Sequence, residues 1–146
     1  MIPRVCVTVV WAINAASFTK DFIVATEQRL GVAPQPTDLL IASARVRPSA
    51  AHFTLTRRMC DCHALVGLRG DPEVEGETTA SDLLGWLRDL PSVAPHTIRV
   101  AVLRAWSPTQ GAIKPARARD VGIADVDEHL LRGIGDEELV TIDYPR

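Results

Sequence analysis

The sequence predicts a single α+β domain with a mostly antiparallel β-sheet and two main helices. Its 146 residues match the length of one ordinary domain. Apolar residues make up 47% and charged residues 23% of the chain, as in average globular proteins, so the whole chain is expected to fold. Apolar runs of strand length alternate with only two strongly helical patterns, and this order predicts the fold class.

The first two elements are expected to be a buried strand and a helix. Residues 4–12 are almost all β-branched or apolar, as in a strand that is buried on both faces. Ser17 is expected to cap a helix with apolar residues at helical spacing, which Gly31 ends. The N-terminal run also resembles a signal peptide, but it is short for one and rich in valine, which favours the strand.

The middle of the chain is expected to add two or three strands. The second strand is predicted at residues 38–46, where Arg47 and Pro48 end it. Alternation from Ala51 onward predicts a third strand with one apolar and one polar face. Residues 62–68 return as a fourth strand in a hairpin, or the third strand simply runs on.

The second helix is the clearest element of the sequence. Thr79 and Asp82 have the spacing of a capping box, and the apolar stripe that follows predicts a helix that Pro91 ends. The elements expected after it are a buried strand at residues 97–106, a loop at 107–119, a short helix at 127–132 and a last strand at 139–142.

This order of elements matches the ferredoxin-like βαββαβ plait, followed by a C-terminal helix and strand as an extension. Right-handed crossovers place both main helices on one face of the sheet. The strands at residues 4–12 and 97–106 are apolar on both sides, so the second face also needs a cover. The C-terminal segment, a ligand or a second copy of the chain can supply it, and a homodimer is expected.

The net charge and the lengths of the apolar runs argue against nucleic acid and membranes as partners. The formal net charge of −2 gives no general reason to bind nucleic acid, and no apolar run approaches the ~18 to 20 residues of a membrane span. Residues 39–60 and 99–119 carry only basic charges, whereas residues 120–143 are strongly acidic. We expect these segments to neutralise each other across the fold or across a dimer.

The motif Cys60-Asp61-Cys62-His63 is the strongest candidate for chemistry. Cysteines two apart on an extended chain point the same way, so both sulfurs can reach one soft metal ion, with His63 or Asp61 as a further ligand. If the first and third strands are antiparallel neighbours, Cys6 also lies close to Cys60. The three cysteines together with His63 would then complete a tetrahedral zinc site.

The same motif also allows thiol chemistry. Cys60 or Cys62, beside basic residues and His63, would have a stabilised thiolate and could serve an enzyme as nucleophile or redox centre. A disulfide between these two cysteines would be strained and therefore labile. The simplest alternative is two inert, reduced thiols at a strand end. An odd count of 3 cysteines does not resemble a secreted disulfide framework, which predicts a cytoplasmic location.

Two further sets of residues are candidates for ligand binding. The first is a polar strip on the sheet face away from the helices, formed by Thr8, His52, Thr54 and Thr56. The second belongs to a loop that could close over an anionic ligand, and it consists of Trp106, Lys114 and Arg117. Threonine is also common in strands for structural reasons alone.

The function expected from these observations is regulatory binding of a small molecule or a protein partner through the sheet face away from the helices. The alternative is a metal-binding protein or thiol enzyme centred on the Cys60–His63 motif. No P-loop, dinucleotide fingerprint, HExxH or GxSxG motif occurs in the sequence, so the common nucleotide, zinc-protease and hydrolase signatures are absent from it.

Overall fold

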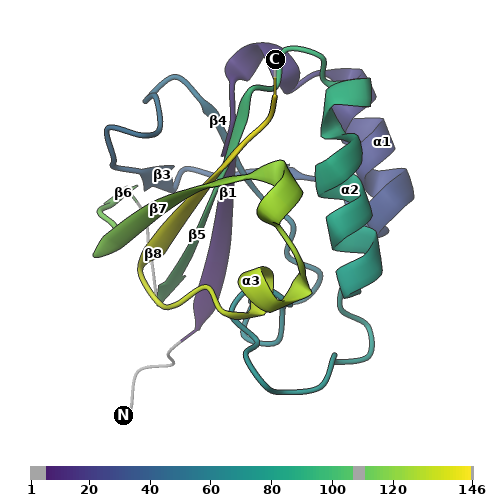
Figure 1. Cartoon of the computed structure of the whole chain (residues 1–146), viewed down its shortest axis with the longest axis vertical. Coiled ribbons are helices and arrows are strands. Elements are labelled where there is room, and N and C mark those ends of the chain that lie inside the picture. Colours follow the sequence, from purple (N-terminus) through teal and green to yellow (C-terminus); the bar gives the residue numbers. More distant parts are fainter. Residues whose placement is uncertain (1–5, 107–110, 146) are drawn as a thin grey trace.

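A mixed six-stranded sheet organises the part of the chain that the computed structural model describes, which is residues 6–106 and 111–145 (Figure 1). Its strands, in the spatial order β2-β4-β1-β5-β8-β7, are Gln35–Pro36, Ala51–Thr54, Val7–Ile13, Arg99–Trp106, Glu138–Asp143 and Arg117–Gly122. The α+β class is confirmed. The sheet is mixed, because β7 pairs with β8 in parallel whereas the other neighbouring strands pair antiparallel.

The second strand of the sheet lies earlier in the chain than predicted. Residues 35–36 form β2 and pair with β4, and Pro36 is tolerated because β2 is an edge strand. The predicted strand at residues 38–46 is mostly loop. It contributes only β3 (Leu40–Ile41), which pairs in parallel with β6 (Ala112–Ile113) in a separate two-stranded sheet. Its side chains of Leu39, Ile41 and Val46 are buried against the sheet instead of lying within it, whereas Leu40 is exposed.

Two other predicted segments also differ from the structure. Residues 62–68 form turns, and their apolar side chains pack into the core beside the helices. The predicted loop at residues 107–119 contains β6 and the start of β7, and its residues 107–110 lie outside the described part. Strand β7 has a mostly exposed or half-buried polar sequence, so it lacks the apolar pattern of a buried strand.

The helices are α1 (Lys20–Leu30), α2 (Ala80–Val93) and α3 (Glu128–Arg132). Thr19, not Ser17, caps α1 by accepting a hydrogen bond from the N–H of Phe22. The predicted cap of α2 is confirmed, because the Thr79 hydroxyl accepts from the N–H of Asp82. Pro91 does not end α2 but lies within its last turn. None of the described helices is long and apolar enough to cross a membrane.

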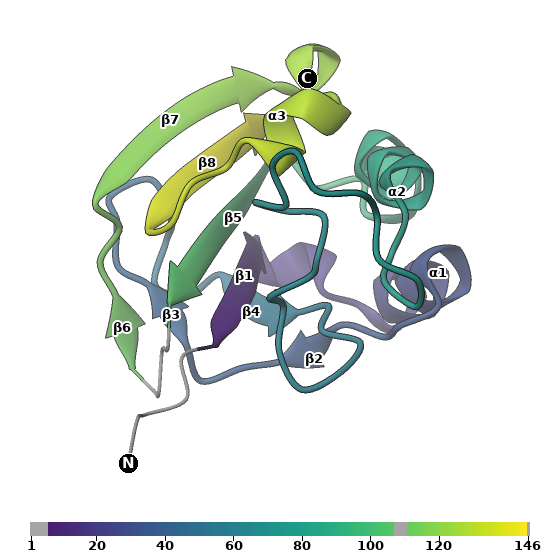
Figure 2. The same ribbon diagram turned by 90° about the horizontal axis from the view of Figure 1, so that it is seen from below.

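The two faces of the sheet are covered by different parts of the chain. Helices α1 and α2 pack on one face, and β3 and β6 lie on the opposite side (Figure 2). On the helix side, Trp11 meets Trp86 edge to face, with ring centroids 5.3 Å apart. On the reverse side, residues 39–46 cover the sheet with the side chains of Leu39, Ile41 and Val46. The middle of the reverse face is therefore covered by residues 39–46, which were not among the expected covers.

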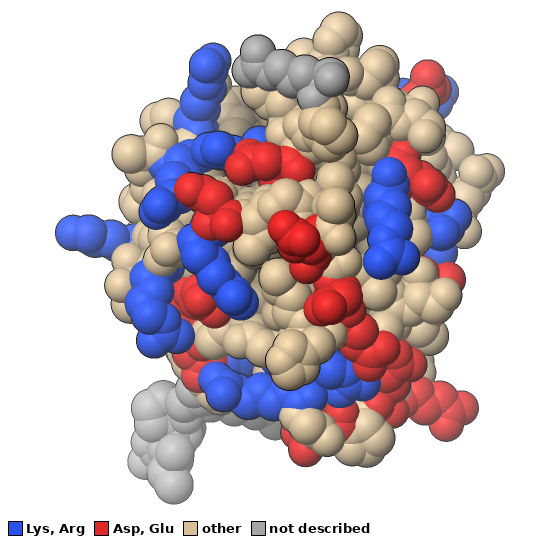
Figure 3. Space-filling view, viewed as in Figure 1, with Lys and Arg blue, Asp and Glu red and all other residues tan. Residues whose placement is uncertain are grey.

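Ion pairs within the chain join the basic segments to the acidic C-terminal segment. The nitrogen–oxygen distances are 3.1 Å for Arg45–Asp120, 2.6 Å for Arg99–Asp143 and 3.3 Å for Arg119–Glu138. Figure 3 shows both signs of charge interspersed on the face that carries β7 and β8. The expected neutralisation is thus confirmed within a single chain, although exposed pairs of this kind contribute little stability each.

Thr26→Val is expected to lower the free energy of unfolding by about 1 to 2 kcal/mol, because it leaves the buried Trp86 indole N–H without its acceptor. That N–H donates to the Thr26 hydroxyl at 2.9 Å. Urea unfolding measures the loss. Thr54→Val is the matched control, since no hydrogen bond of the Thr54 hydroxyl is found among the described residues. A loss no larger than that of the control would contradict the role of this hydrogen bond.

Candidate functional site

The candidate site begins where β1 loses one of its neighbours. Strand β4 pairs with β1 only from Trp11 to Ile13, so the start of β1 is free on that edge. The loop after β4 takes this place. The N–H of Asp61 donates to the carbonyl of Val7 at 2.8 Å, and the N–H of Val7 donates to the Cys62 sulfur at 3.3 Å. The loop is thereby fixed beside the strand that Cys6 precedes.

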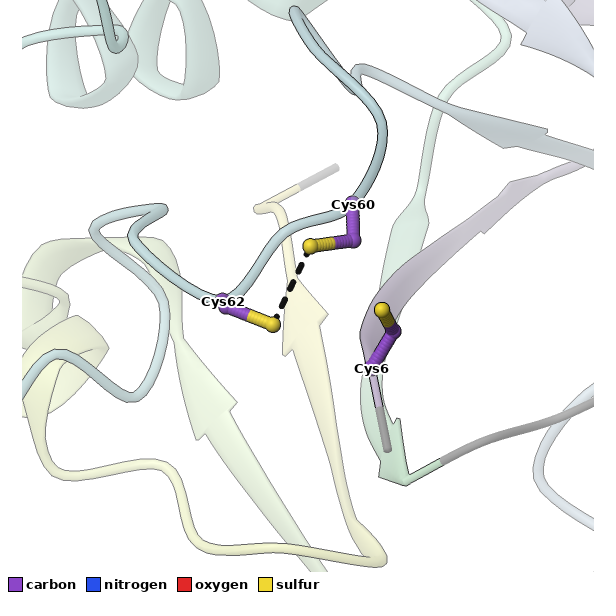
Figure 4. A group of neighbouring side chains, drawn as sticks. All are labelled: Cys6, Cys60 and Cys62. Carbon is purple, nitrogen blue, oxygen red and sulfur yellow. Dashed lines mark hydrogen bonds between the residues drawn. The ribbon is translucent and has the colours of Figure 1, made fainter. Parts of the chain in front are cut away.

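The three cysteines converge at this point. Their sulfur atoms all lie within 4.8 Å of one another, and the Cys60 and Cys62 sulfurs are 3.1 Å apart. Figure 4 shows the sulfurs facing a common space, with two cysteines coming from the loop and Cys6 from the start of β1. The convergence predicted from the antiparallel pairing of β1 and β4 is confirmed. All three side chains are partly exposed, so an ion or a small reagent can reach them.

His63 is not brought into this group. Its side chain is exposed, and the potential ligands within 4.8 Å of one another are the three cysteines. The structure thus brings together three of the four predicted zinc ligands. A fourth ligand from solvent or from a bound molecule would be needed to complete a tetrahedral site.

The buried side chain of Asp61 holds the cysteine loop in place through hydrogen bonds. It is 4% exposed, and its carboxylate accepts hydrogen bonds from the N–H of Val9 at 2.7 Å and from the Thr56 hydroxyl at 2.9 Å. The carboxylate also lines a cavity of about 40 Å³, which is large enough for water. Burial raises the pKa of Asp61. Asp61 is therefore a positioning residue that points inward while both flanking cysteines remain near the surface.

The two thiols of the loop differ in acidity. In the singly ionised pair the Cys62 thiol donates a hydrogen bond to the Cys60 thiolate, and this interaction lowers the pKa of Cys60. Burial raises the pKa of Cys62. The first proton is therefore lost from Cys60, so Cys60 is the more readily ionised thiol of the two.

Arg104 supplies positive charge near the sulfurs and was not predicted as a site residue. It lies on β5 with a side chain only 12% exposed, forms an ion pair with Asp136 and interacts electrostatically with Cys62. Its side chain passes over Gly67, whose φ of 81° and missing Cβ leave the space for it. Burial lowers the pKa of Arg104. An arginine inside a strand expected to be buried on both faces was the signal in the sequence.

The residues of the predicted polar strip are divided between the reverse face and the cysteine loop. Thr8 and His52 lie on the reverse side of β1 and β4, whereas Thr56 binds Asp61 in the cysteine loop. His52 is buried, its Nδ1 lies 3.0 Å from the carbonyl of Ala50, and burial lowers its pKa. Thr54 is half-buried at the register position opposite Gln35.

The residues of the predicted closing loop are also not gathered around a ligand. The Trp106 indole donates to Asp136, and the Trp106 backbone N–H donates to the Glu137 carboxylate at 2.9 Å. These bonds tie Trp106 to the turn that precedes β8. Lys114 and Arg117 are exposed on the β6–β7 segment, and the Arg117 guanidinium lies beside Gly135.

The geometry of the cysteine group allows two kinds of chemistry, namely binding of a soft metal ion and reactions of the Cys60 and Cys62 thiols. No protein-family model matches this chain, and neither the curated proteins nor the solved structures contain a match to it. The distances and charges within the group are therefore the basis for ranking metal binding against thiol chemistry.

Asp61→Ala is expected to lower the free energy of unfolding by about 2 kcal/mol, because it leaves the Val9 N–H and the Thr56 hydroxyl without their acceptor. Asp61→Asn retains an oxygen that can accept these bonds and should cost clearly less. Urea unfolding of the wild-type protein and both variants at one pH measures the difference. Equal losses in the two variants would show that the side-chain oxygen does not hold the loop.

The stability of the wild-type protein relative to the Asp61→Asn variant should fall as the pH rises. Burial raises the Asp61 pKa above its ordinary 3.8, so the folded protein holds this proton more tightly than the unfolded chain. The resulting stabilisation is complete below the ordinary value and is lost as pH rises through the raised native value. Urea unfolding at intervals from about pH 3 to pH 7 tests this, and a constant difference between the two proteins would contradict it.

Proposed function

We propose that this protein binds a soft metal ion such as Zn²⁺ through the thiolates of Cys6, Cys60 and Cys62. The observation that carries the proposal is the approach of three sulfurs from two distant segments to within 4.8 Å of one another. Thiolates that bind one zinc ion at about 2.3 Å lie roughly 3.8 Å apart in a tetrahedral site. The 3.1 Å between the Cys60 and Cys62 sulfurs and the 4.8 Å limit for the whole group lie on either side of that spacing.

The surroundings of the sulfurs support binding in the thiolate form. Three thiolates and one divalent cation leave a net negative charge, which neighbouring donors and cations can offset. The Val7 N–H donates to the Cys62 sulfur at 3.3 Å, and the Arg104 guanidinium adds a positive charge nearby. Both groups belong to strands of the central sheet, so their positions do not depend on the ion.

The site also has features of an exchangeable metal site rather than a structural one. The hydrogen bonds of Asp61 to the Val9 N–H and the Thr56 hydroxyl fix the cysteine loop through groups that are not metal ligands. Three protein ligands leave a fourth position for water, a bound molecule or His63. Reduced thiols are required, which fits the cytoplasmic location expected from the sequence.

A thiol reaction is the second candidate function, favoured by the 3.1 Å between the Cys60 and Cys62 sulfurs and by the lowered pKa of Cys60. In this reaction the Cys60 thiolate would attack a disulfide of a second molecule, and Cys62 would then displace that molecule. The products would be a Cys60–Cys62 disulfide and two thiols of the partner, so the partner is the oxidant.

Two broader expectations from the sequence have unequal support. The order and directions of β2, β4, β1 and β5 support a ferredoxin-like plait at the centre of the sheet, and we infer that β7 and β8 extend it. Pairing of two subunits through the reverse face lacks a basis, because residues 39–46 cover the middle of that face.

Metal-free, reduced protein is expected to bind one equivalent of Co²⁺, seen as sulfur-to-metal charge-transfer absorption, and Zn²⁺ should displace it. Cys6→Ser, Cys60→Ser and Cys62→Ser should each weaken Zn²⁺ binding by more than about tenfold, because each removes one of three thiolates. Met59→Ala is the control, since Met59 lies in the same loop and is 84% exposed. His63→Ala shows whether His63 takes the fourth position.

The metal and thiol proposals give different results in this experiment. Circular dichroism of the metal-free protein should already show the full fold, and alkylation of the thiols should slow when Zn²⁺ is added. No charge-transfer band, or Zn²⁺ binding by all three serine variants as tight as that of the wild-type protein, would exclude the metal site. Fast alkylation of Cys60 alone, together with no metal uptake, would favour the thiol reaction instead.

A further inference from the structure

A second hollow lies on the reverse face, at the opposite end of β1 from the cysteines. It has a volume of about 790 Å³, which is in the range of small-molecule sites. Its floor contains Ala12 and Ala101, which face each other on β1 and β5. The reverse-face pair nearest to them on these strands is Val10 and Leu103, whose side chains are bulky. Two small side chains side by side therefore leave the space.

Apolar side chains form the inner wall of this pocket. Val46 and Ala50 reach it from the segment that covers the reverse face, and Ile98 reaches it from the residue before β5. Ile98 is 51% exposed although it is a large apolar residue. An apolar ligand group placed against Ile98 and the floor would remove this surface from water, which favours binding.

The rim of the pocket is basic. It carries Arg45, Arg47 and Arg99 against a single carboxylate, that of Asp143. Arg99 is paired with Asp143, and Arg45 with Asp120. Arg47 is exposed and takes part in no ion pair within residues 6–106 and 111–145, so it is the cation most available to a ligand. Arginine side chains bind carboxylate and phosphate groups with two parallel hydrogen bonds.

We propose that this pocket binds a small molecule with an apolar body and one anionic group, either a carboxylate or a phosphate ester. The anionic group would lie at Arg47, and the apolar body would lie over Ala12 and Ala101. The proposal does not depend on the metal site, because Val7 and Ala12 are roughly 17 Å apart along the strand. Removing the cysteines should therefore leave this binding unchanged.

The test is an NMR titration of the full chain with benzoate, phenyl phosphate and the neutral control benzyl alcohol. Saturable shifts are expected for the amides of residues 12–16, 45–50 and 98–101 with at least one of the anionic probes. The probe that binds more tightly identifies the anionic group. Shifts from benzyl alcohol as large as those from the anions would overturn the proposal, as would the absence of saturable shifts in these residues.

Two variants test where the anionic group and the apolar body of the ligand bind. Arg47→Gln should weaken binding of the anionic probe by about fivefold or more, because it removes a guanidinium at the surface without touching the core. Arg29→Gln is its matched control, since Arg29 is an exposed arginine on α1, on the opposite side of the sheet. Ala101→Leu should abolish binding by filling the floor. Binding that is unchanged in the Arg47→Gln variant would overturn the proposal even if the Ala101→Leu variant fails to fold.

Discussion

The structure depends on satisfying the backbone of β1 at the point where β4 turns away from it. Buried N–H and C=O groups need partners, and the start of β1 is buried on its helix side at Val7 and Val9. The loop after β4 supplies these partners with the backbone of Asp61, its carboxylate and the Cys62 sulfur. The cysteines are thus held beside β1 by a requirement of the sheet itself. The three cysteines are preorganised because the backbone of β1 requires the loop after β4 as its hydrogen-bond partner.

Strand β1 also separates the two candidate sites. Its odd-numbered residues face the helices, while Val10 and Ala12 face the reverse side. The cysteine group is at the start of the strand, and the basic pocket is near its end. A rigid central strand of this kind can hold two sites apart without coupling them, since neither site needs a change in the other to form.

The sequence predicted the buried elements and much of the cysteine group, and it failed where exposure or competing packing decided the structure. Buried elements need apolar residues at strand or helix spacing, and this spacing is visible in the sequence. It predicted the strands β1, β5 and β8 and the capped helix α2. Strand β7 was missed because an exposed edge carries no such pattern. The apolar residues from Leu39 to Val46 have the pattern of a strand, yet this segment is mostly loop and covers the reverse face of the sheet. The positioning role of Asp61 could not be predicted, because it depends on how the loop turns.

The order of the last strands has a consequence for synthesis of the chain. Strand β7 precedes β8 in the sequence, but in the sheet β8 lies between β5 and β7. Strand β7 therefore has no partner in the sheet until residues 138–143 have been made and can pair with β5. Until then the edge of β5 is exposed and its arginines lack their carboxylate partners. When β8 pairs with β5, it covers this edge and brings Asp143 to Arg99. A chain cut before Glu138 would leave that edge of β5 unpaired and Arg99 without its partner Asp143.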